Sequence, residues 1–401
     1  MRFSIYLILS LIIISVTAQD HPTCNTQRYR VDVFENVTVT NDVMYSIDNT
    51  IGGNEVELYM DIYEPEGDAE VERPVIVLAF GGSFINGTRG DISGLCTRFA
   101  RKGYVAVSID YRLYDKALIP LPTEREMQDV VIRAIKDMKT AIRFLDDDAR
   151  AENTYGVDMD WLYLGGVSSG GITAAHCAML DSTDAFSESL QGYINQHAPI
   201  YGITDTDESI KIRGVLNYSG GLRQVDWIDA GDPPFISFHD DGDPTVPYKG
   251  GYAQIFGQNI IYLNGSFALD SVAQQVGVRS QLITFPRDAH VSYFFDEEEI
   301  VDVVNQSAFF MYEMICSETA DVKNMIDGTP YTFGPNPTQN NIVLSTKGNA
   351  KVELYDLAGK QLHSQSIVNE VVLDLKGLVV GNYLLKITVN GKTYTERVVK
   401  D

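Results

Sequence analysis

The stretch Gly165-Gly166-Val167-Ser168-Ser169-Gly170-Gly171 decides the fold of the larger part of this chain. A short apolar run of strand type, 161–164, precedes it, and a run typical of a buried helix, 172–180, follows it. The pattern is G-x-S-x-G, in which a sharp turn between strand and helix presents the hydroxyl of Ser168. A serine hydroxyl is a poor nucleophile by itself. A catalytic interpretation therefore requires a base, an orienting acid and N–H donors for an oxyanion elsewhere in the chain.

Buried strands and helices alternate around this turn. The continuous apolar runs 74–80 and 104–110 indicate strands that are covered on both faces. Apolar residues recur at helical spacing over 127–145, and period-two runs at 29–39 and 55–63 indicate edge strands with one wet face. Three further strands are expected, over 213–220, 234–238 and 281–285. The alternation predicts an α/β fold with a mostly parallel central sheet flanked by helices.

Two loops could supply the missing chemical groups. Consecutive glycines after the first buried strand leave backbone N–H groups open, which predicts an oxyanion hole at Gly82 and Ser83 together with the N–H of Ser169. The acidic turn 239–247 offers Asp243 as the orienting acid, with Asp240 and Asp241 as rivals. His290, just past the last expected strand, is the candidate base, and it is one of only six histidines.

Composition bounds the class of protein. A length of 401 residues allows one large domain and one small one. The chain carries 31 basic and 55 acidic side chains, a net charge of −24, which argues against nucleic acid or an anionic membrane as a partner. No spacing of cysteines resembles a zinc site, and the expected chemistry requires no metal or organic cofactor.

The first 18 residues have the pattern of a signal peptide. A single early charge, Arg2, is followed by the apolar run 5–16 and by small residues that predict cleavage after Ala18. The run is short for a membrane span, and no second long apolar stretch follows, so no permanent span is expected. In an exported chain the four cysteines permit two disulfides with three connectivities, although Cys177 could equally be a buried free thiol. These cysteines are Cys24, Cys96, Cys177 and Cys316.

Residues 25–320 resemble the α/β-hydrolases of the carboxylesterase and feruloyl-esterase kind. The motifs that carry the resemblance are 80–84, 108–113, 166–170, and 239–247 followed by 288–290. The family usually has His-Gly-Gly-Gly where this chain has Phe80-Gly81-Gly82-Ser83, a change that leaves the backbone donors in place. The order Ser168, Asp243, His290 is the order of the family's catalytic triad.

This resemblance implies that 19–324 is a catalytic domain with the α/β-hydrolase fold, and that 181–211 is either a cap insertion or an ordinary surface loop. It implies a serine carboxylesterase that forms an acyl-enzyme, with a small-molecule or polymer ester as substrate. The alternatives are a peptidase of the prolyl-oligopeptidase type and an inactive binding protein on the same fold. The ester itself stays open among feruloyl esters, acetylated sugars, lipids and polyesters.

The tail, 325–401, is predicted to be a separate small β-sandwich, because short strands alternate with turn signals at even spacing. Residues 331–401 hold 8 basic and 6 acidic groups, whereas the rest of the mature chain holds 22 against 49. The tail resembles the C-terminal sorting domain of the type IX secretion system in 335–338, 354–360, the Gly381-x-Tyr383 strand and the basic end at Lys400. The resemblance implies contact with the outer-membrane secretion machinery, and a protein that is secreted or attached to the cell surface. The alternative is a carbohydrate-binding or spacer module.

Overall fold

The computed structural model describes residues 27–181, 184, 186, 191, 210–316, 331–334, 338, 341–356, 360–389 and 392–400. The predicted signal peptide, Cys24 and most of the predicted cap insertion lie outside this described part. The chain divides into two compact units, one holding Gln19–Ser317 and the other holding Glu318–Asp401. Each unit is described by itself.

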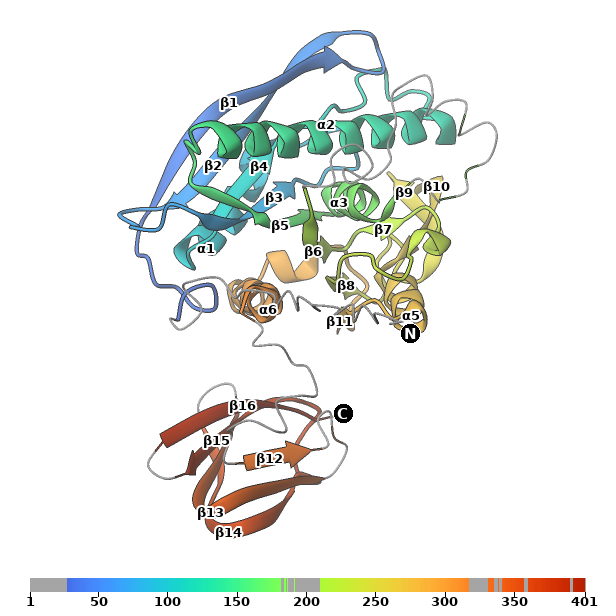
Figure 1. The fold of residues 1–401 in the computed structure, drawn as a ribbon. Coiled ribbons are helices and arrows are strands. Elements are labelled where there is room, and N and C mark those ends of the chain that lie inside the picture. Colours follow the sequence, from blue (N-terminus) through green and yellow to red (C-terminus); the bar gives the residue numbers. More distant parts are fainter. Residues whose placement is uncertain are drawn as a thin grey trace, which may run out of the picture. The chain divides into compact units, whose positions relative to one another are not determined.

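An eight-stranded sheet forms the centre of the first unit, in the order β1-β2-β4-β3-β5-β6-β8-β11 (Figure 1). The first two strands run antiparallel to their neighbours, and the other six are parallel to one another. In sheet order the strands are β1 (Val37–Asn49), β2 (Glu55–Pro65), β4 (Val105–Ile109), β3 (Arg73–Ala79), β5 (Val157–Val167), β6 (Ile212–Tyr218), β8 (Phe235–Asp240) and β11 (Ser280–Phe285). The prediction of a mostly parallel sheet is confirmed, and every residue of β3 and β4 is buried.

One predicted strand is wrong. The alternating run 29–39 is not a strand over most of its length, because β1 begins only at Val37 and Tyr29 is a fully buried core residue in a turn. The Tyr104 hydroxyl donates to the carbonyl oxygen of Tyr29 at 3.1 Å, and the Tyr29 N–H donates to the Lys102 carbonyl at 2.7 Å. Tertiary hydrogen bonds therefore hold this segment in place, whereas the sequence predicted the strand-to-strand hydrogen bonds of a β-sheet.

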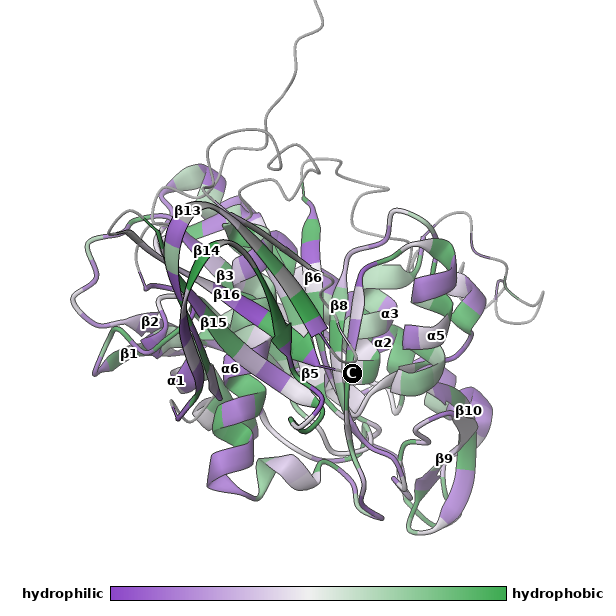
Figure 2. Ribbon diagram, turned by 90° about the horizontal axis from the view of Figure 1, so that it is seen from below, coloured by the Kyte–Doolittle hydropathy of each residue, from purple (hydrophilic) through white to green (hydrophobic). Residues whose placement is uncertain are grey.

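Helices cover both faces of the sheet. Helices α1 (Ser93–Arg101) and α6 (Glu297–Ile315) lie on one face, and α2 (Glu124–Ala151) and α3 (Ser169–Met179) lie on the other (Figure 1). Helix α5 (Ser266–Val276) packs along β11. Hydrophobic and hydrophilic residues alternate along α5 and α6, as expected of helices with one face on the core (Figure 2). No helix among the described residues combines the length and apolarity that crossing a membrane requires.

A second, three-stranded sheet was not anticipated from the sequence. It has the order β7-β10-β9 and consists of β7 (Gly221–Leu222), β10 (Gln258–Gly265) and β9 (Gly250–Ile255). Strands β9 and β10 form an antiparallel hairpin with a register shift between Asn259 and Ile261. This hairpin matters for the site because its apolar side chains form one wall of the pocket described below.

The second unit is all β, as predicted. Its strands are antiparallel in the order β12-β13-β15-β16, with β14 pairing to β13. They are β12 (Tyr331–Gly334), β13 (Asn341–Asp356), β14 (Gln361–Asp374), β15 (Gly381–Val389) and β16 (Lys392–Lys400). A hydrophobic core of its own, with Ile342, Leu354 and Leu385 fully or nearly fully buried, accounts for its compactness.

The two disulfides that four cysteines would permit do not both form. Cys96 and Cys177 are both free and both buried. Burial raises the pKa of the Cys177 thiol to about 11 and raises that of Cys96 still further, so neither is a reactive thiolate at neutral pH. The alternative interpretation of Cys177 as a buried free thiol is therefore correct. Because Cys96 and Cys177 are free, Cys24 and Cys316 are the one pair of cysteines left to form a disulfide.

Candidate active site

Ser168 occupies a strained turn between β5 and α3. Its backbone angles are φ 54° and ψ −115°, a conformation that costs about 1–3 kcal/mol for a residue other than glycine. Two glycines make the turn possible. A Cβ on Gly166 would lie 2.3 Å from the carbonyl carbon of Gly170, and a Cβ on Gly170 would lie 2.0 Å from the carbonyl oxygen of Ala79. The G-x-S-x-G pattern is thus a steric requirement of this turn.

The structure brings Ser168, His290 and Asp243 together in one hydrogen-bonded chain. The Ser168 hydroxyl lies 2.8 Å from Nε2 of His290, and Nδ1 of His290 lies 2.6 Å from Oδ2 of Asp243. Asp243 follows β8 and His290 follows β11, which is the neighbouring parallel strand. Both side chains therefore stand at the carboxyl edge of the sheet, beside the turn that carries Ser168.

The structure separates Asp243 from its two rivals. The Asp240 carboxylate is buried and accepts hydrogen bonds from the N–H and the hydroxyl of Ser292. Asp241 is exposed, and its N–H donates to the Phe285 carbonyl. Among the three acids, Asp243 is the one in contact with His290.

A second histidine, His239, approaches the same carboxylate oxygen of Asp243, Oδ2, that His290 contacts. It is fully buried, and its Nδ1 accepts from the Ser266 hydroxyl at 2.7 Å. Its Nε2–H consequently points to the Val246 carbonyl at 3.1 Å and to Oδ2 of Asp243 at 3.3 Å. The sequence marked His239 only as the start of the acidic turn, because nothing local shows that its ring folds back onto the carboxylate.

The pKa of the Asp243 carboxyl group lies below its ordinary value. Burial raises this pKa, but hydrogen bonds from His239 and His290 and the N–H donors of Thr245 and Val246 favour the ionised form. The two backbone donors lie 2.8 and 3.0 Å from Oδ1. A carboxylate held in this way is ionised at neutral pH and can stabilise an imidazolium beside it.

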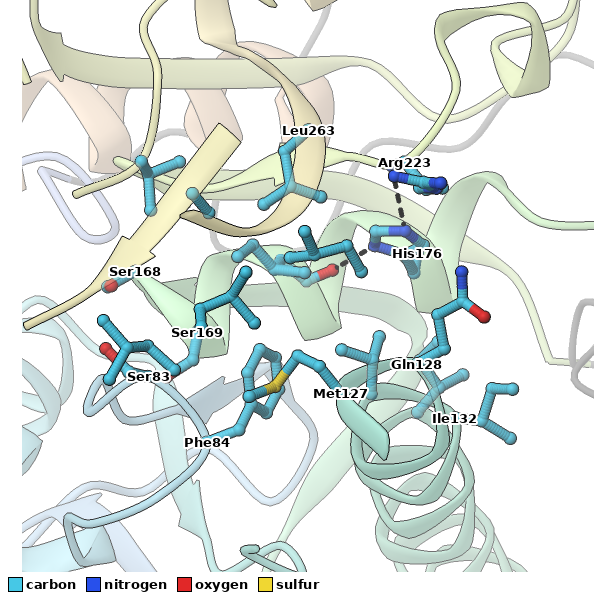
Figure 3. Close-up of a pocket in the computed structure, with 18 of the residues that line it drawn as sticks. Ser83, Phe84, Met127, Gln128, Ile132, Ser168, Ser169, His176, Arg223 and Leu263 are labelled. Atoms are coloured by element: carbon cyan, nitrogen blue, oxygen red, sulfur yellow. Dashed lines mark hydrogen bonds between the residues drawn. The ribbon is translucent and has the colours of Figure 1, made fainter. Parts of the chain in front are cut away.

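The loop after β3 has the geometry of a donor site. Gly82 has φ 136°, and the next two residues, Ser83 and Phe84, have φ 55° and 61°. A Cβ on Gly82 would lie 2.1 Å from the Asn86 carbonyl oxygen, so glycine is required there. Within the described part of the chain, the backbone N–H groups of Ser83 and Ser169 donate to no acceptor. Both residues line the pocket beside Ser168 (Figure 3).

Tyr111 anchors this loop without the histidine that related proteins have in place of Phe80. Its hydroxyl donates to the Phe80 carbonyl at 2.8 Å and lies 3.1 Å from the hydroxyl oxygen of Ser169. Its ring stacks on Phe80 with the ring centroids 4.4 Å apart. One side chain therefore holds the glycine loop and the start of α3 at a fixed separation. The next residue, Arg112, forms a buried ion pair with Asp137 on α2 at 2.7 Å and fixes the chain that follows β4.

A pocket opens beside Ser168 and runs between α2, α3 and the β9–β10 hairpin. Its volume is about 820 Å³ including the open mouth. Ser83, Ser168 and Ser169 lie at one end, and Gln128, His176 and Arg223 lie at the other (Figure 3). The walls between these ends are apolar and include Met127, Val131, Ile132, Ile135, Ile172, Ala253, Ile255, Ile260, Ile261 and Leu263.

Two of the polar groups at the far end of the pocket, those of His176 and Arg223, already have hydrogen-bond partners. Nδ1–H of His176 donates to the Ile172 carbonyl at 2.7 Å, and Nε2 accepts from the Arg223 N–H at 3.2 Å (Figure 3). Burial lowers the pKa of His176 to about 4, so the ring is neutral at physiological pH. The Arg223 guanidinium donates to the Tyr262 carbonyl and to Glu124. The His176 ring is therefore uncharged, and the Arg223 charge is paired with Glu124.

The sheet order, the turn at Ser168 and the placement of Asp243 and His290 after successive strands define the protein as an α/β-hydrolase. The larger unit has this fold, and the smaller one is a separate all-β unit.

Comparison with known families agrees with both parts. Residues 60–253 match the family BD-FAE, and residues 333–401 match the secretion system C-terminal sorting domain. The chain thus combines a BD-FAE α/β-hydrolase domain with a sorting domain of the type IX secretion system, as the sequence motifs indicated.

Individual relatives are distant esterases. Esterase LipQ of Mycobacterium tuberculosis is 26% identical over 195 residues, which cover 43% of this chain and 43% of that protein. Isoprenylcysteine alpha-carbonyl methylesterase ICME of Arabidopsis thaliana is 22% identical over 257 residues, which cover 61% of this chain and 56% of that protein. This chain therefore spans about half of the length of these curated relatives. A thermophilic esterase of Thermogutta terrifontis, solved with propionate bound, is 22% identical with a TM-score of 0.48, and the match covers 70% of this chain and 94% of that one.

Proposed function

We propose that this protein is a secreted serine carboxylesterase that works through an acyl-enzyme intermediate. The observation that carries the proposal is the continuous chain from the Ser168 hydroxyl through His290 to the Asp243 carboxylate, with contacts of 2.8 and 2.6 Å. These distances meet the requirement that a general base be within hydrogen-bond reach of the proton it abstracts. The hydrolase family of residues 60–253 and the esterase relatives support the same reaction class.

In the first half-reaction Ser168 Oγ attacks the ester carbonyl carbon while Nε2 of His290 takes the hydroxyl proton. Asp243 keeps the imidazole in the tautomer that presents a lone pair to Ser168, and it stabilises the imidazolium that forms. The developing oxyanion accepts hydrogen bonds from the N–H groups of Ser169 and of the Gly82–Ser83 loop. His290 then returns the proton to the leaving alcohol, and an acyl-Ser168 intermediate remains.

In the second half-reaction a water molecule takes the place of the alcohol. His290 removes its proton, the hydroxide oxygen attacks the acyl carbon, and the same N–H donors stabilise the second oxyanion. Collapse of this intermediate releases the carboxylic acid and restores the Ser168 hydroxyl. Each such N–H donor contributes about 3 kcal/mol to transition-state stabilisation.

Removing the nucleophile tests the proposal. Ser168→Ala should lower kcat on a chromogenic short-chain ester by about 10⁵- to 10⁶-fold, because the hydroxyl that forms the covalent bond is gone. Circular dichroism should show an unchanged fold, since alanine fits the space that serine leaves.

The adjacent residue is the matched control for this experiment. Ser169→Ala should stay within a few-fold of the wild type, because the proposed donor is the backbone N–H, and among the described residues the hydroxyl bonds to Tyr111. An active Ser168→Ala protein beside an inactive Ser169→Ala protein would show that the nucleophile has been assigned to the wrong residue.

A panel of aminoacyl amides alongside the esters separates an esterase from a peptidase. A wild type that hydrolyses neither kind of substrate would be the inactive binding protein.

Export is the second half of the proposal. The sorting domain indicates transport across the outer membrane, and the pattern of 1–18 supports passage through the inner membrane as a signal peptide. We therefore place the mature enzyme outside the cell or on its surface. There an acidic hydrolase would meet esters of polymers, lipids or small molecules.

A further inference from the structure

We propose that the pocket beside Ser168 binds the acyl part of the substrate, and that this acyl part is an unbranched apolar chain of about eight to ten carbons. The inference rests on the proposed function, because it names the substrate class of the same site. Three properties of the pocket carry it: the position of the pocket relative to His290, its depth, and the chemistry of its walls.

The position of the pocket assigns it to the acyl group. His290 must hand a proton to the leaving alcohol, so the alcohol has to lie beside this ring. His290 is not among the described residues that line the pocket, whereas Ser83, Ser168 and Ser169 are. The pocket therefore extends from the acyl carbon on the side of the proposed oxyanion donors, away from the leaving group.

The depth of the pocket sets the chain length. Ser168 and His176 both line it and are separated by two turns of α3, a rise of about 12 Å, which is the length of an extended acyl chain of about eight to ten carbons. The far end is closed by the edge-to-face pair of His176 and Trp227, whose ring centroids are 5.7 Å apart. An acetyl group would leave most of this length unfilled.

The walls select an unsubstituted chain. Apolar side chains from α2, α3, β9 and β10 surround the middle of the pocket. Both nitrogens of His176 bond to backbone, and the Arg223 guanidinium bonds to Tyr262 and Glu124. A sugar hydroxyl or a carboxylate placed in this apolar middle section would lose its hydration without gaining a partner there, which disfavours such groups strongly. Among the polar side chains on the walls, that of Gln128 makes no hydrogen bond within the described part of the chain, and neither do the hydroxyls of Ser83 and Thr245.

Chain-length profiles test the inference. We would measure kcat/KM for 4-nitrophenyl esters from acetate to dodecanoate, in which the alcohol stays constant. Each methylene buried should raise kcat/KM by about three- to fourfold, so octanoate or decanoate should exceed acetate by about a hundredfold or more. Dodecanoate should fall again, because the pocket ends at His176 and Trp227. A profile that is flat, or highest at acetate, overturns the inference.

Two variants that fill the pocket locate the effect. Ile132→Trp enlarges a buried side chain near the far end, and Ala253→Phe enlarges a half-buried one on the hairpin. Either change should move the maximum to butanoate or hexanoate and should lower octanoate activity at least tenfold more than acetate activity. Ala253 is half exposed, so its variant should fold even where the Ile132 variant does not. The control is Tyr252→Phe, because Tyr252 neighbours Ala253 on β9 but is half exposed and does not line the pocket.

A third variant separates an aliphatic from a hydroxylated aromatic acyl group. Gln128→Leu should raise octanoate activity, since it replaces an amide that bonds to no atom of an aliphatic chain by an apolar side chain. A wild type that prefers a hydroxycinnamate ester to octanoate, with a tenfold loss of that preference in Gln128→Leu, would overturn the aliphatic assignment.

Binding provides a readout that does not depend on turnover. Ser168→Ala protein should bind octanoate at least tenfold more tightly than acetate by calorimetry, and Ala253→Phe added to it should abolish the difference. A wild type that hydrolyses no ester contradicts the proposed function. An active wild type without chain-length selectivity, or equal binding of the two acids, contradicts this inference alone.

Discussion

Backbone strain is distributed very differently between the hydrolase unit and the C-terminal unit. Within the described residues, every non-glycine residue with a positive φ belongs to the hydrolase unit. Several of them surround the site: Ser83, Phe84, Ser168, Ser219 and Val291. In the described part of the C-terminal unit, the positive φ belongs to a glycine, Gly381.

The difference shows where fixed geometry is needed. Each strained residue costs about 1–3 kcal/mol and persists only if the surroundings hold it in place. Around Ser168 the surroundings do so with buried polar contacts, such as the Ser219 hydroxyl at 3.0 Å from the Tyr293 hydroxyl. The C-terminal unit is a ladder of antiparallel strands over a small apolar core, which suits a surface that is recognised but performs no chemistry.

After loss of the nucleophile, the largest effect is expected from removing one charge from the candidate active site of the hydrolase unit. Asp243→Asn should lower kcat by about 10⁴-fold, because asparagine keeps the shape but favours the wrong tautomer of His290. Thermal unfolding should show that the protein remains folded.

Two neighbouring acids provide the controls for Asp243. Asp241→Asn should be nearly silent, since Asp241 is exposed and its N–H bond to Phe285 is retained. Asp240→Asn should act mainly on stability, through its contacts with Ser292. Equal and mild effects of all three substitutions on kcat would remove Asp243 from the proposed triad.

An intermediate effect is expected from pH, through the buried His176. Its folded-state pKa of about 4 lies below the ordinary value of 6.5, so the unfolded chain binds a proton in this interval while the folded chain does not. The contribution to stability is therefore fully present above pH 6.5 and is lost as the pH falls to about 4. A shift of this size corresponds to about 3 kcal/mol.

Tryptophan fluorescence during urea unfolding measures this effect in the full chain. Both tryptophans, Trp161 and Trp227, lie in the hydrolase unit, so the signal reports on that unit alone. His176→Asn should lower the free energy of unfolding at pH 7 and flatten its decline between pH 6.5 and 4. A variant with the same decline as the wild type would show that other groups cause the pH dependence.

The smallest expected effect is that of the tail on catalysis. A fragment of residues 19–324 should hydrolyse small esters at the same rate as the full mature chain, because every proposed catalytic residue precedes residue 291. In a host with the matching secretion system, deletion of 331–401 should leave active enzyme in the periplasm.

Two outcomes would change this view of the tail. Normal appearance of the truncated protein outside the cell would contradict the sorting role. Unchanged export together with weaker binding to an insoluble polymer would support a spacer or binding module instead.

Much of the fold was accessible from local sequence patterns. Strands β3, β4, β6, β8 and β11 coincide with the predicted runs to within about two residues, and β3, β4 and β8 are buried along their whole length, whereas β11 is only half-buried. Burial on both faces favours continuous apolar residues. The elbow at Ser168 was equally accessible, because the glycines at 166 and 170 are required by backbone contacts within one strand–turn–helix unit. The predicted boundary near residue 325 rested on the even strand spacing and Gly/Pro-rich entry of the tail, with support from the charge difference between the acidic hydrolase part and the mildly basic tail.

What only the tertiary structure decided depends on residues far apart in the chain. The contact between Asp243 and His290, the fold of His239 back onto that carboxylate and the anchoring of the glycine loop by Tyr111 depend on contacts between separate strands. The pocket is lined by side chains from α2, from α3 and from the β9–β10 hairpin, which no sequence motif predicted. The sequence by itself determined which backbone conformations were sterically allowed and which segments had to be buried, because steric contacts and hydrophobicity act locally along the chain. The partners of polar side chains, and the shape of the space left between helices and strands, were decided by packing across the whole sheet.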